Sequence, residues 1–151
     1  MATDPLGRKE TLEWLFWQVG NQGPMGGQYS HFHNYAPETE KYGYAKERYT
    51  NEYNRCLAVL ERRLAGRDYI IGDYSIADMI CWPWVLIAKA MGLSLDAYPN
   101  VTRWRLAVKE RPAVQRGVAL GKDDRRSAPP TEEEHRMLFQ QTGDIPIRPK
   151  G

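Results

Sequence analysis

Cysteine is scarce in this chain of 151 residues: only Cys56 and Cys81 occur, and no Cys-X-X-Cys pair is present. Two cysteines cannot form the disulfide framework of a small secreted domain, and their spacing does not match a zinc site. Both fall on apolar positions of predicted helices, where a thiol acts as a small buried hydrophobic group rather than a reactive one. The cysteine content therefore favours a reduced, cytoplasmic protein.

Long apolar stretches are also missing. No run approaches the roughly 20 residues that a membrane-spanning helix needs. The N-terminal residues Ala2 to Pro5 are polar and lack the apolar core of a signal peptide. We therefore expect a protein that is neither embedded in a membrane nor secreted.

An excess of charge of one sign is absent too. The 21 basic and 19 acidic residues give a net charge of +2 and are interleaved along the chain, which argues against a nucleic-acid surface. Histidine is rare, and His31 and His33 lie two positions apart without a nearby Cys or paired carboxylates. We expect no metal site.

What the sequence has is helical periodicity. Apolar residues recur every three or four positions within residues 11–19, 38–65, 75–91, 99–111 and 112–121, and no segment shows the alternation of a strand. The 42% hydrophobic content suffices for one globular domain. We predict an all-α bundle of five to six helices over residues 1–120. Residues 121–151 are expected to form an extended, partly ordered tail with one short helix after a capping box at Thr131.

The first predicted helix has apolar residues on two sides. We expect the core to receive the stripe formed by Leu12, Leu15, Phe16 and Val19. Trp14 and Trp17 lie off this stripe, and a single core does not require them, so we expect another domain or subunit to cover them. Four glycines and a proline in residues 20–27 predict a bend or break before an ordered segment at residues 28–32.

Ser75 and Asp78 predict the start of the most apolar helix. Ser75 suits the N-cap position, and the Asp78 carboxylate can reach back to the Ser75 N–H and lie at the positive end of the helix dipole. Asp78 is acidic, as a general base is, but the cap uses its oxygens, so we assign both residues a structural role. Replacing Asp78 with Ala is expected to cost about 1 kcal/mol.

Several motifs occur in a fixed order along the chain. They are Trp14-Leu15-Phe16-Trp17-Gln18, Gln22-Gly23-Pro24-Met25-Gly26-Gly27-Gln28 followed by His31-Phe32, Glu47-Arg48-Tyr49, Ser75-Ile76-Ala77-Asp78 with Trp82-Pro83-Trp84, Tyr98-Pro99, and Arg111-Pro112-Ala113-Val114. Over about residues 12–120 the chain resembles the C-terminal helical domain of glutathione transferases, specifically the bacterial nu class and the related fungal nitrogen regulator.

The resemblance implies glutathione as cosubstrate and a small hydrophobic or disulfide substrate, which complete family members conjugate or reduce. Those members carry an N-terminal thioredoxin-like domain that activates the glutathione thiol, and these 151 residues do not contain it. We therefore expect a truncated family member, name no catalytic residue, and expect a homodimer or a thioredoxin-like domain as partner. The alternative is a non-catalytic protein-interaction module, a role that such helical domains have in translation factors and synthetase complexes.

The resemblance also implies binding residues. Arg48 matches the arginine by which nu-class enzymes reach the glutathione of a neighbouring subunit, and a guanidinium can donate two parallel hydrogen bonds to a carboxylate. Helical spacing alone predicts instead an ion pair between Arg48 and Glu52 on a solvated face. The implied walls of the substrate pocket are Trp17, Met25, Gln28, His31 and Phe32. The alternative for this segment is a packed helix break without a binding role.

Overall fold

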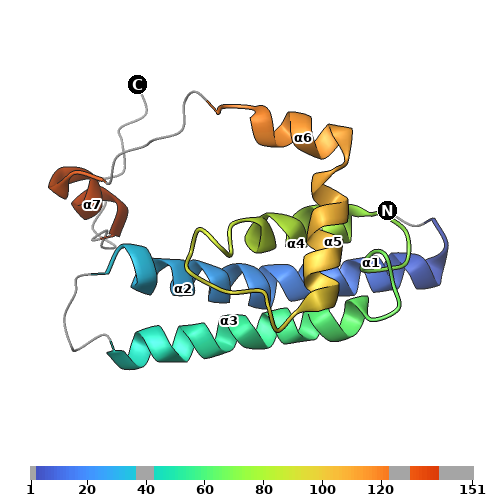
Figure 1. Cartoon of the computed structure of the whole chain (residues 1–151), viewed down its shortest axis with the longest axis horizontal. Helices are drawn as coiled ribbons and strands as arrows, with labels where there is room; N and C mark the ends of the chain where they lie inside the picture. The colour runs from blue at the N-terminus through green and yellow to red at the C-terminus, as the bar shows by residue number, and fades with distance from the viewer. Residues whose placement is uncertain (1–2, 37–42, 123–129, 140–151) are drawn as a thin grey trace, which may run out of the picture. The chain divides into compact units, whose positions relative to one another are not determined.

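The computed structural model describes residues 3–36, 43–122 and 130–139, and these residues are helical apart from turns and two isolated bridges between residues 69 and 73. The elements are α1 (Pro5–Trp17), the π-helical segment η1 (Gln18–Gln22), α2 (Gly23–Asn34), α3 (Gly43–Leu64), α4 (Ile76–Leu86), α5 (Pro99–Lys109), α6 (Pro112–Ala119) and α7 (Glu132–Phe139) (Figure 1). The predicted all-α fold is confirmed.

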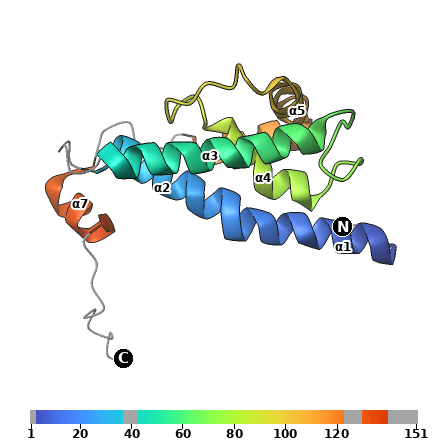
Figure 2. The same ribbon diagram turned by 90° about the horizontal axis from the view of Figure 1, so that it is seen from below.

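The chain divides into two compact units, residues 1–115 and 116–151. In the first unit, α1, η1 and α2 form one continuous rod. Figure 2 shows α3 alongside α2, with α4 between the diverging α1 and α3. Helix α5 crosses this layer and packs on α3 and α4 (Figure 1).

In the second unit, α7 begins with the predicted capping box. The Thr131 N–H donates to Glu134 Oε2 at 2.8 Å, and the Glu134 N–H donates to Thr131 Oγ1 at 3.3 Å.

The core of the first unit is centred on α4, as its apolar sequence predicts. Its fully or nearly fully buried side chains include Ala77, Cys81, Trp82 and Val85 from α4, Tyr53, Cys56, Leu57, Leu60 and Leu64 from α3, and Val101, Trp104 and Val108 from α5. Burial of each large apolar side chain contributes about 1.5–3 kcal/mol. None of the described helices combines the length and the apolar character that crossing a bilayer requires.

The capping box at the start of α4 is present and ties three segments together. Ser75 Oγ accepts from the Ala77 N–H at 3.1 Å, and Asp78 Oδ2 accepts from the Ser75 N–H at 2.9 Å. The other oxygen, Oδ1, accepts from the Ile70 N–H at 3.0 Å and from the Trp104 indole at 2.8 Å. Asp78 is completely buried, so it also connects α4 to the preceding loop and to α5.

The predicted inner stripe of the first helix is wrong for Phe16 and Val19, while Leu12 and Leu15 are half-buried. Phe16 is 73% exposed and Val19 is 59% exposed, whereas the buried residues of this region are Thr11, Gln18 and Gln22. Two of these polar side chains donate hydrogen bonds: Thr11 Oγ1 donates to the Gly7 carbonyl, and Gln22 Nε2 donates to the Cys81 carbonyl of α4. Gln22 Oε1 is buried without a partner among the described residues. Hydrophobicity alone did not predict this orientation.

The glycine-rich segment does not break the helix. The chain passes through the π turn of η1 directly into α2, and Pro24, which has no N–H to donate to the preceding turn, follows this π turn. The glycines serve packing instead. A Cβ atom on Gly26 would lie 2.8 Å from Trp84 Cε3 and 3.1 Å from Tyr53 Cε2. Gly26 therefore allows α2 to approach α3 and α4 closely.

The predicted ends of α3 and α4 agree with the structure to different degrees. Helix α3 agrees with the predicted helix over its described residues. Residues 38–42 of that prediction lie outside the described residues. Gly66, at which the helix is expected to end, has a left-handed φ of 69°. Helix α4 ends at Leu86 rather than near Met91. After it, the chain forms turns that bury Ala88, Met91 and Leu93, and Gly92 has a φ of 84°.

Candidate functional site

Facing stripes of α2 and α3 bring together most of the side chains that the sequence singled out. One stripe holds Asn21 from the adjoining η1 and Met25, Gln28 and Phe32 from α2, which recur every three or four residues. The other holds Arg48, Tyr49, Glu52 and Arg55. We call these eight residues the α2–α3 surface. Asn21 Oδ1 lies 3.5 Å from Arg55 Nη2 at one end, and the Phe32 ring stacks on Tyr49 at the other, with centroids 5.4 Å apart.

Arg48 lies at the N-terminal end of the α3 stripe. Its Nη1 is 3.2 Å from Glu52 Oε1, so the ion pair that helical spacing predicts is present. Glu52 also pairs with Arg55 at 3.0 Å. The hydrogen bond from Arg55 and the two guanidinium charges lower the pKa of the Glu52 carboxyl. One carboxylate thus serves two arginines, and the Arg48 side chain remains 55% exposed.

The predicted pocket residues fall into two groups. Met25, Gln28 and Phe32 belong to the α2–α3 surface, and His31 lies edge-on to Phe32 with ring centroids 5.3 Å apart. Trp17 does not join them. It ends α1 and packs edge-on against Trp14, whose ring lies below the Arg63 guanidinium. Both tryptophans are partly exposed.

Three residues of the α2–α3 surface escaped the sequence reasoning: Asn21, Tyr49 as a stacking partner, and Arg55. The spacing of Arg48, Glu52 and Arg55 at i, i+4 and i+7 was the signal that could have revealed the charged row. No sequence pattern reports that Phe32 stacks on Tyr49, because this contact depends on how α2 and α3 pair.

The two cysteines do not add a nucleophile. Cys56 and Cys81 are buried in the core, and burial raises the pKa of both thiols. In the described part of the chain, no cluster of three His, Cys, Asp or Glu side chains could hold a metal ion. The α2–α3 surface therefore offers aromatic walls and guanidinium donors for binding, while the described residues provide no activated thiol.

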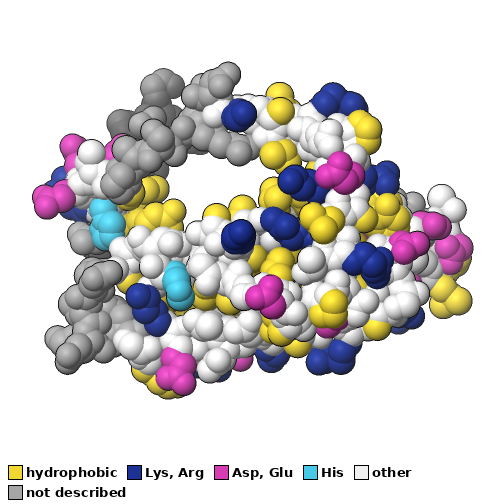
Figure 3. Space-filling view, in the orientation of Figure 1, with side chains coloured by type: hydrophobic (Ala, Val, Ile, Leu, Met, Phe, Trp, Pro, Cys, Tyr) yellow, Lys and Arg dark blue, Asp and Glu magenta, His cyan; other side chains and the backbone are white. Residues whose placement is uncertain are grey.

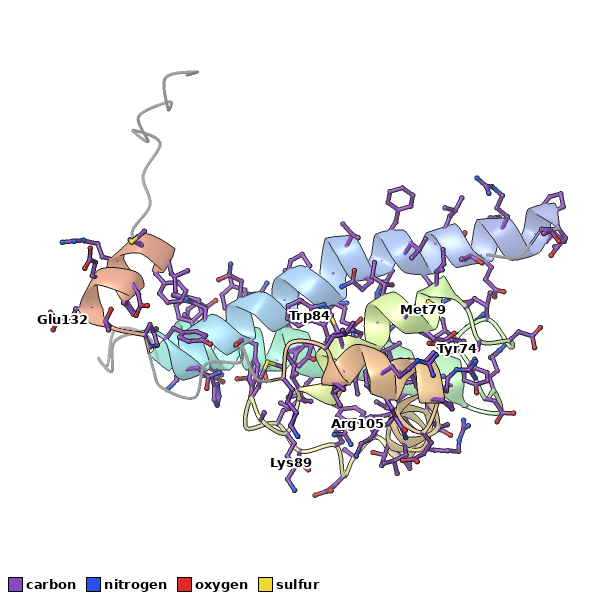
Figure 4. The ribbon with its side chains drawn as sticks, turned by 90° about the horizontal axis from the view of Figure 1, so that it is seen from above. Tyr74, Met79, Trp84, Lys89, Arg105 and Glu132 are labelled. Atoms are coloured by element: carbon purple, nitrogen blue, oxygen red, sulfur yellow. The ribbon has the colours of Figure 1, made fainter. Side chains whose placement is uncertain are left out.

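Large apolar side chains are exposed on the neighbouring helices α1 and α4. Phe16 on α1, Val19 on η1, Met79 on α4 and Ile87, which directly follows α4, are each more than 40% exposed, and Figure 4 labels Met79 on α4 beside α1. We call these four residues the apolar face. Met79, Pro83 and Ile87 lie four residues apart on one side of α4. Helices α1 and α4 pack together, and exposed apolar side chains on neighbouring helices favour coverage by another protein part.

The chain resembles known proteins over most of its described residues. The family described as "Glutathione S-transferase, C-terminal domain" matches residues 43–107. Disulfide-bond oxidoreductase YfcG of Escherichia coli is 47% identical over 114 residues, which make up 75% of this chain and 51% of that protein. Disulfide-bond oxidoreductase YghU of Escherichia coli is 40% identical over 143 residues, covering 89% of this chain and 48% of the relative.

A solved structure is similar over the same region. A glutathione transferase from Burkholderia graminis, crystallised with two glutathione molecules bound per subunit, matches with a TM-score of 0.75 and 40% identity. The match covers 81% of this chain and 53% of that one. The chain thus spans about half the length of the relatives that it matches.

Proposed function

We propose a function from the premise that this chain belongs to the glutathione S-transferase family, of which it carries the C-terminal helical domain. It supplies the substrate-binding half of a nu-class enzyme that uses glutathione to reduce disulfides or to conjugate electrophiles. The observation that carries this proposal is the α2–α3 surface, where the wall residue Phe32 stacks on Tyr49, the neighbour of Arg48 in the chain. The two oxidoreductase relatives support the disulfide chemistry.

Arg48 is proposed to bind a carboxylate of glutathione. Its guanidinium shares Glu52 with Arg55, so the row of two arginines and one carboxylate has one positive charge in excess. A carboxylate of glutathione can replace Glu52 as the partner of Arg48, while Glu52 keeps its ion pair with Arg55. This arrangement lets Arg48 reach a ligand without leaving a carboxylate unpaired.

The substrate wall is proposed to consist of Met25, Gln28, His31, Phe32 and Trp17. The stacked rings of Phe32 and Tyr49 give the wall a rigid aromatic part. Met25 and Gln28 can adapt to different ligands because both side chains are long and unbranched. A wall of this kind suits a small hydrophobic or disulfide substrate.

The thiol of glutathione is proposed to be activated by a thioredoxin-like half, which docks on the apolar face of α1 and α4. Burial of one large apolar side chain contributes about 1.5–3 kcal/mol, so the four side chains of this face favour association. Trp14 and Trp17, on another side of α1, are proposed to meet the same half or a second subunit of a homodimer. We place the protein in the cytoplasm and its helical domain in residues 1–120, with residues 121–151 as a tail.

The second candidate is a non-catalytic interaction module, which the same exposed apolar face favours. The two functions differ in whether glutathione is bound and turned over. Reduction of bis-hydroxyethyl disulfide separates them. The assay compares this chain alone with this chain fused, in the relative's own order, to the part of YfcG that lies outside the matched region. We expect glutathione-dependent turnover in the fusion and little or none in the chain alone, because the described residues provide no activated thiol.

Arg48 provides the internal control of this assay. Arg48→Gln in the fusion should raise the KM for glutathione about fivefold to tenfold, since a charge-assisted hydrogen bond to a carboxylate is lost. Arg62→Gln removes the same charge from an exposed position of α3 and should leave the KM unchanged. If the fusion folds but neither binds glutathione nor reduces the disulfide, both without a substitution and with Arg62→Gln, the result contradicts the enzymatic function and favours the interaction module.

A further inference from the structure

A second concave site lies away from the α2–α3 surface. It is a cleft of about 500 Å³ between the segment that follows α4 and the exposed side of α5. Its polar lining consists of Lys89, Ser94, Asp96, Thr102 and Arg105, and Gly92, Leu93 and Leu95 complete it. None of the eight residues of the α2–α3 surface lines this cleft.

Arg105 is held in the cleft by the backbone of α4. Its carbonyl accepts a hydrogen bond from the Trp82 indole at 3.0 Å, and its Nη2 donates to the Leu86 carbonyl at 3.3 Å. Its Nε is buried and has no hydrogen-bond partner among the described residues. A buried donor without an acceptor costs free energy. The guanidinium is therefore held by the Leu86 carbonyl, while its Nε–H lacks an acceptor among the described residues.

Lys89 places a second positive charge on the same cleft. The ion pairs of the described residues involve neither Lys89 nor Arg105. Figure 4 shows both side chains on the same side of the bundle, and in Figure 3 Lys and Arg side chains gather over α4 and the adjoining part of α5. The wall thus carries two cations that form no ion pair within the described part of the chain, and the Asp96 carboxylate lines the same cleft.

The remaining polar groups of the cleft are two hydroxyls and one carboxylate. Ser94 Oγ accepts from the Asp96 N–H at 3.1 Å, and Thr102 Oγ1 donates to the Leu95 carbonyl at 3.4 Å. The Ser94 hydroxyl keeps its own hydrogen for a ligand, and the Thr102 oxygen can still accept. The Asp96 carboxylate opposes a bound anion, which gives the site a residue whose removal should strengthen binding.

We propose that this cleft binds the oxyanion group of a small organic ligand, a carboxylate or a phosphate ester, between Arg105 and Lys89. The planar guanidinium of Arg105 has N–H donors beyond the one that it gives to the Leu86 carbonyl, and these suit the oxygens of such a group. Lys89 at the rim adds a point charge. The cleft is large enough for a small organic molecule. This site does not depend on glutathione binding at the α2–α3 surface.

The test is a titration of the full chain with inorganic phosphate, and separately with acetate, at constant ionic strength, followed by amide NMR shifts. We expect saturable shifts concentrated in residues 92–96, 102 and 105. Lys89→Gln should weaken the affinity at least about fivefold, while Asp96→Asn should strengthen it. Lys89 and Asp96 are exposed, so both variants should fold. Lys109→Gln, which removes a charge from an exposed position of α5 outside the cleft, should change nothing.

The titrations distinguish a specific oxyanion site from nonspecific binding. Saturation by either ion with these variant effects supports the site, and the ion that binds more tightly identifies the ligand group as phosphate or carboxylate. Shifts that do not saturate with either ion, or that spread over basic residues throughout the chain, overturn the proposal. Equal affinities of Lys89→Gln and Lys109→Gln overturn it as well.

Discussion

At the scale of single residues, Asp78 shows how one side chain can perform more than the role that sequence assigns to it. The capping box predicts one of its bonds, the one to the Ser75 N–H. The structure adds the Ile70 N–H and the Trp104 indole as donors to the same carboxylate. Neither donor is close to Asp78 in the local helix, so no local pattern could have revealed them.

These additional bonds change the expected cost of removing the carboxylate. Asp78→Ala leaves three buried donors without an acceptor, each worth about 1–3 kcal/mol, so we expect the free energy of unfolding to fall by about 3–5 kcal/mol. Ser75→Ala removes only the side-chain cap and should cost about 1 kcal/mol. Urea unfolding followed by circular dichroism measures both. Equal losses in the two variants would show that Asp78 acts as a cap alone.

At the scale of elements, periodicity predicted the helices well and their orientation less well. Helices α3 and α5 follow their apolar stripes and proline signals closely, because their buried faces are apolar. In α1 the predicted stripe lies partly in solvent, because Thr11, Gln18 and Gln22 occupy the inner face. The sequence of a helix does not show whether its apolar stripe packs in the core of its own domain or is covered by a partner.

The glycines of α2 illustrate the same limit, and they can be tested. Gly26→Ala places a Cβ against the rings of Trp84 and Tyr53 and should destabilise the protein by about 1–3 kcal/mol, despite the higher helix propensity of Ala. Gly27→Ala is the matched control in the same helix, because its Cβ would meet only Trp84 Cη2 at 3.9 Å. We expect that variant to be neutral or stabilised by up to about 1 kcal/mol.

Unfolding free energies of the two alanine variants provide the comparison. If Gly26→Ala were as stable as Gly27→Ala, the close approach of α2 at Gly26 would not contribute to stability. The candidate site, too, was predicted only in part from the sequence. The sequence indicated Arg48 and the wall residues of α2 through a family resemblance, but the pairing of Phe32 with Tyr49 and of Asn21 with Arg55 required the tertiary structure.

At the scale of the whole molecule, the first unit has a buried core and an exposed apolar face. Large side chains of α2, α3, α4 and α5 are buried in this core. The apolar face is formed by four residues whose side chains are exposed and do not belong to that core: Phe16, Val19, Met79 and Ile87. In our account this face receives the half of the enzyme that activates glutathione, and the α2–α3 surface then provides the substrate wall.

The most direct test is an isothermal titration of this chain with the unmatched part of YfcG, produced as a separate protein. We predict saturable one-to-one binding that Phe16→Ser weakens at least about tenfold, because a buried ring contributes about 1.5–3 kcal/mol. Leu106→Ser, at an exposed position of α5, should bind as the parent does. Absence of binding, or equal binding by both variants, would contradict the account.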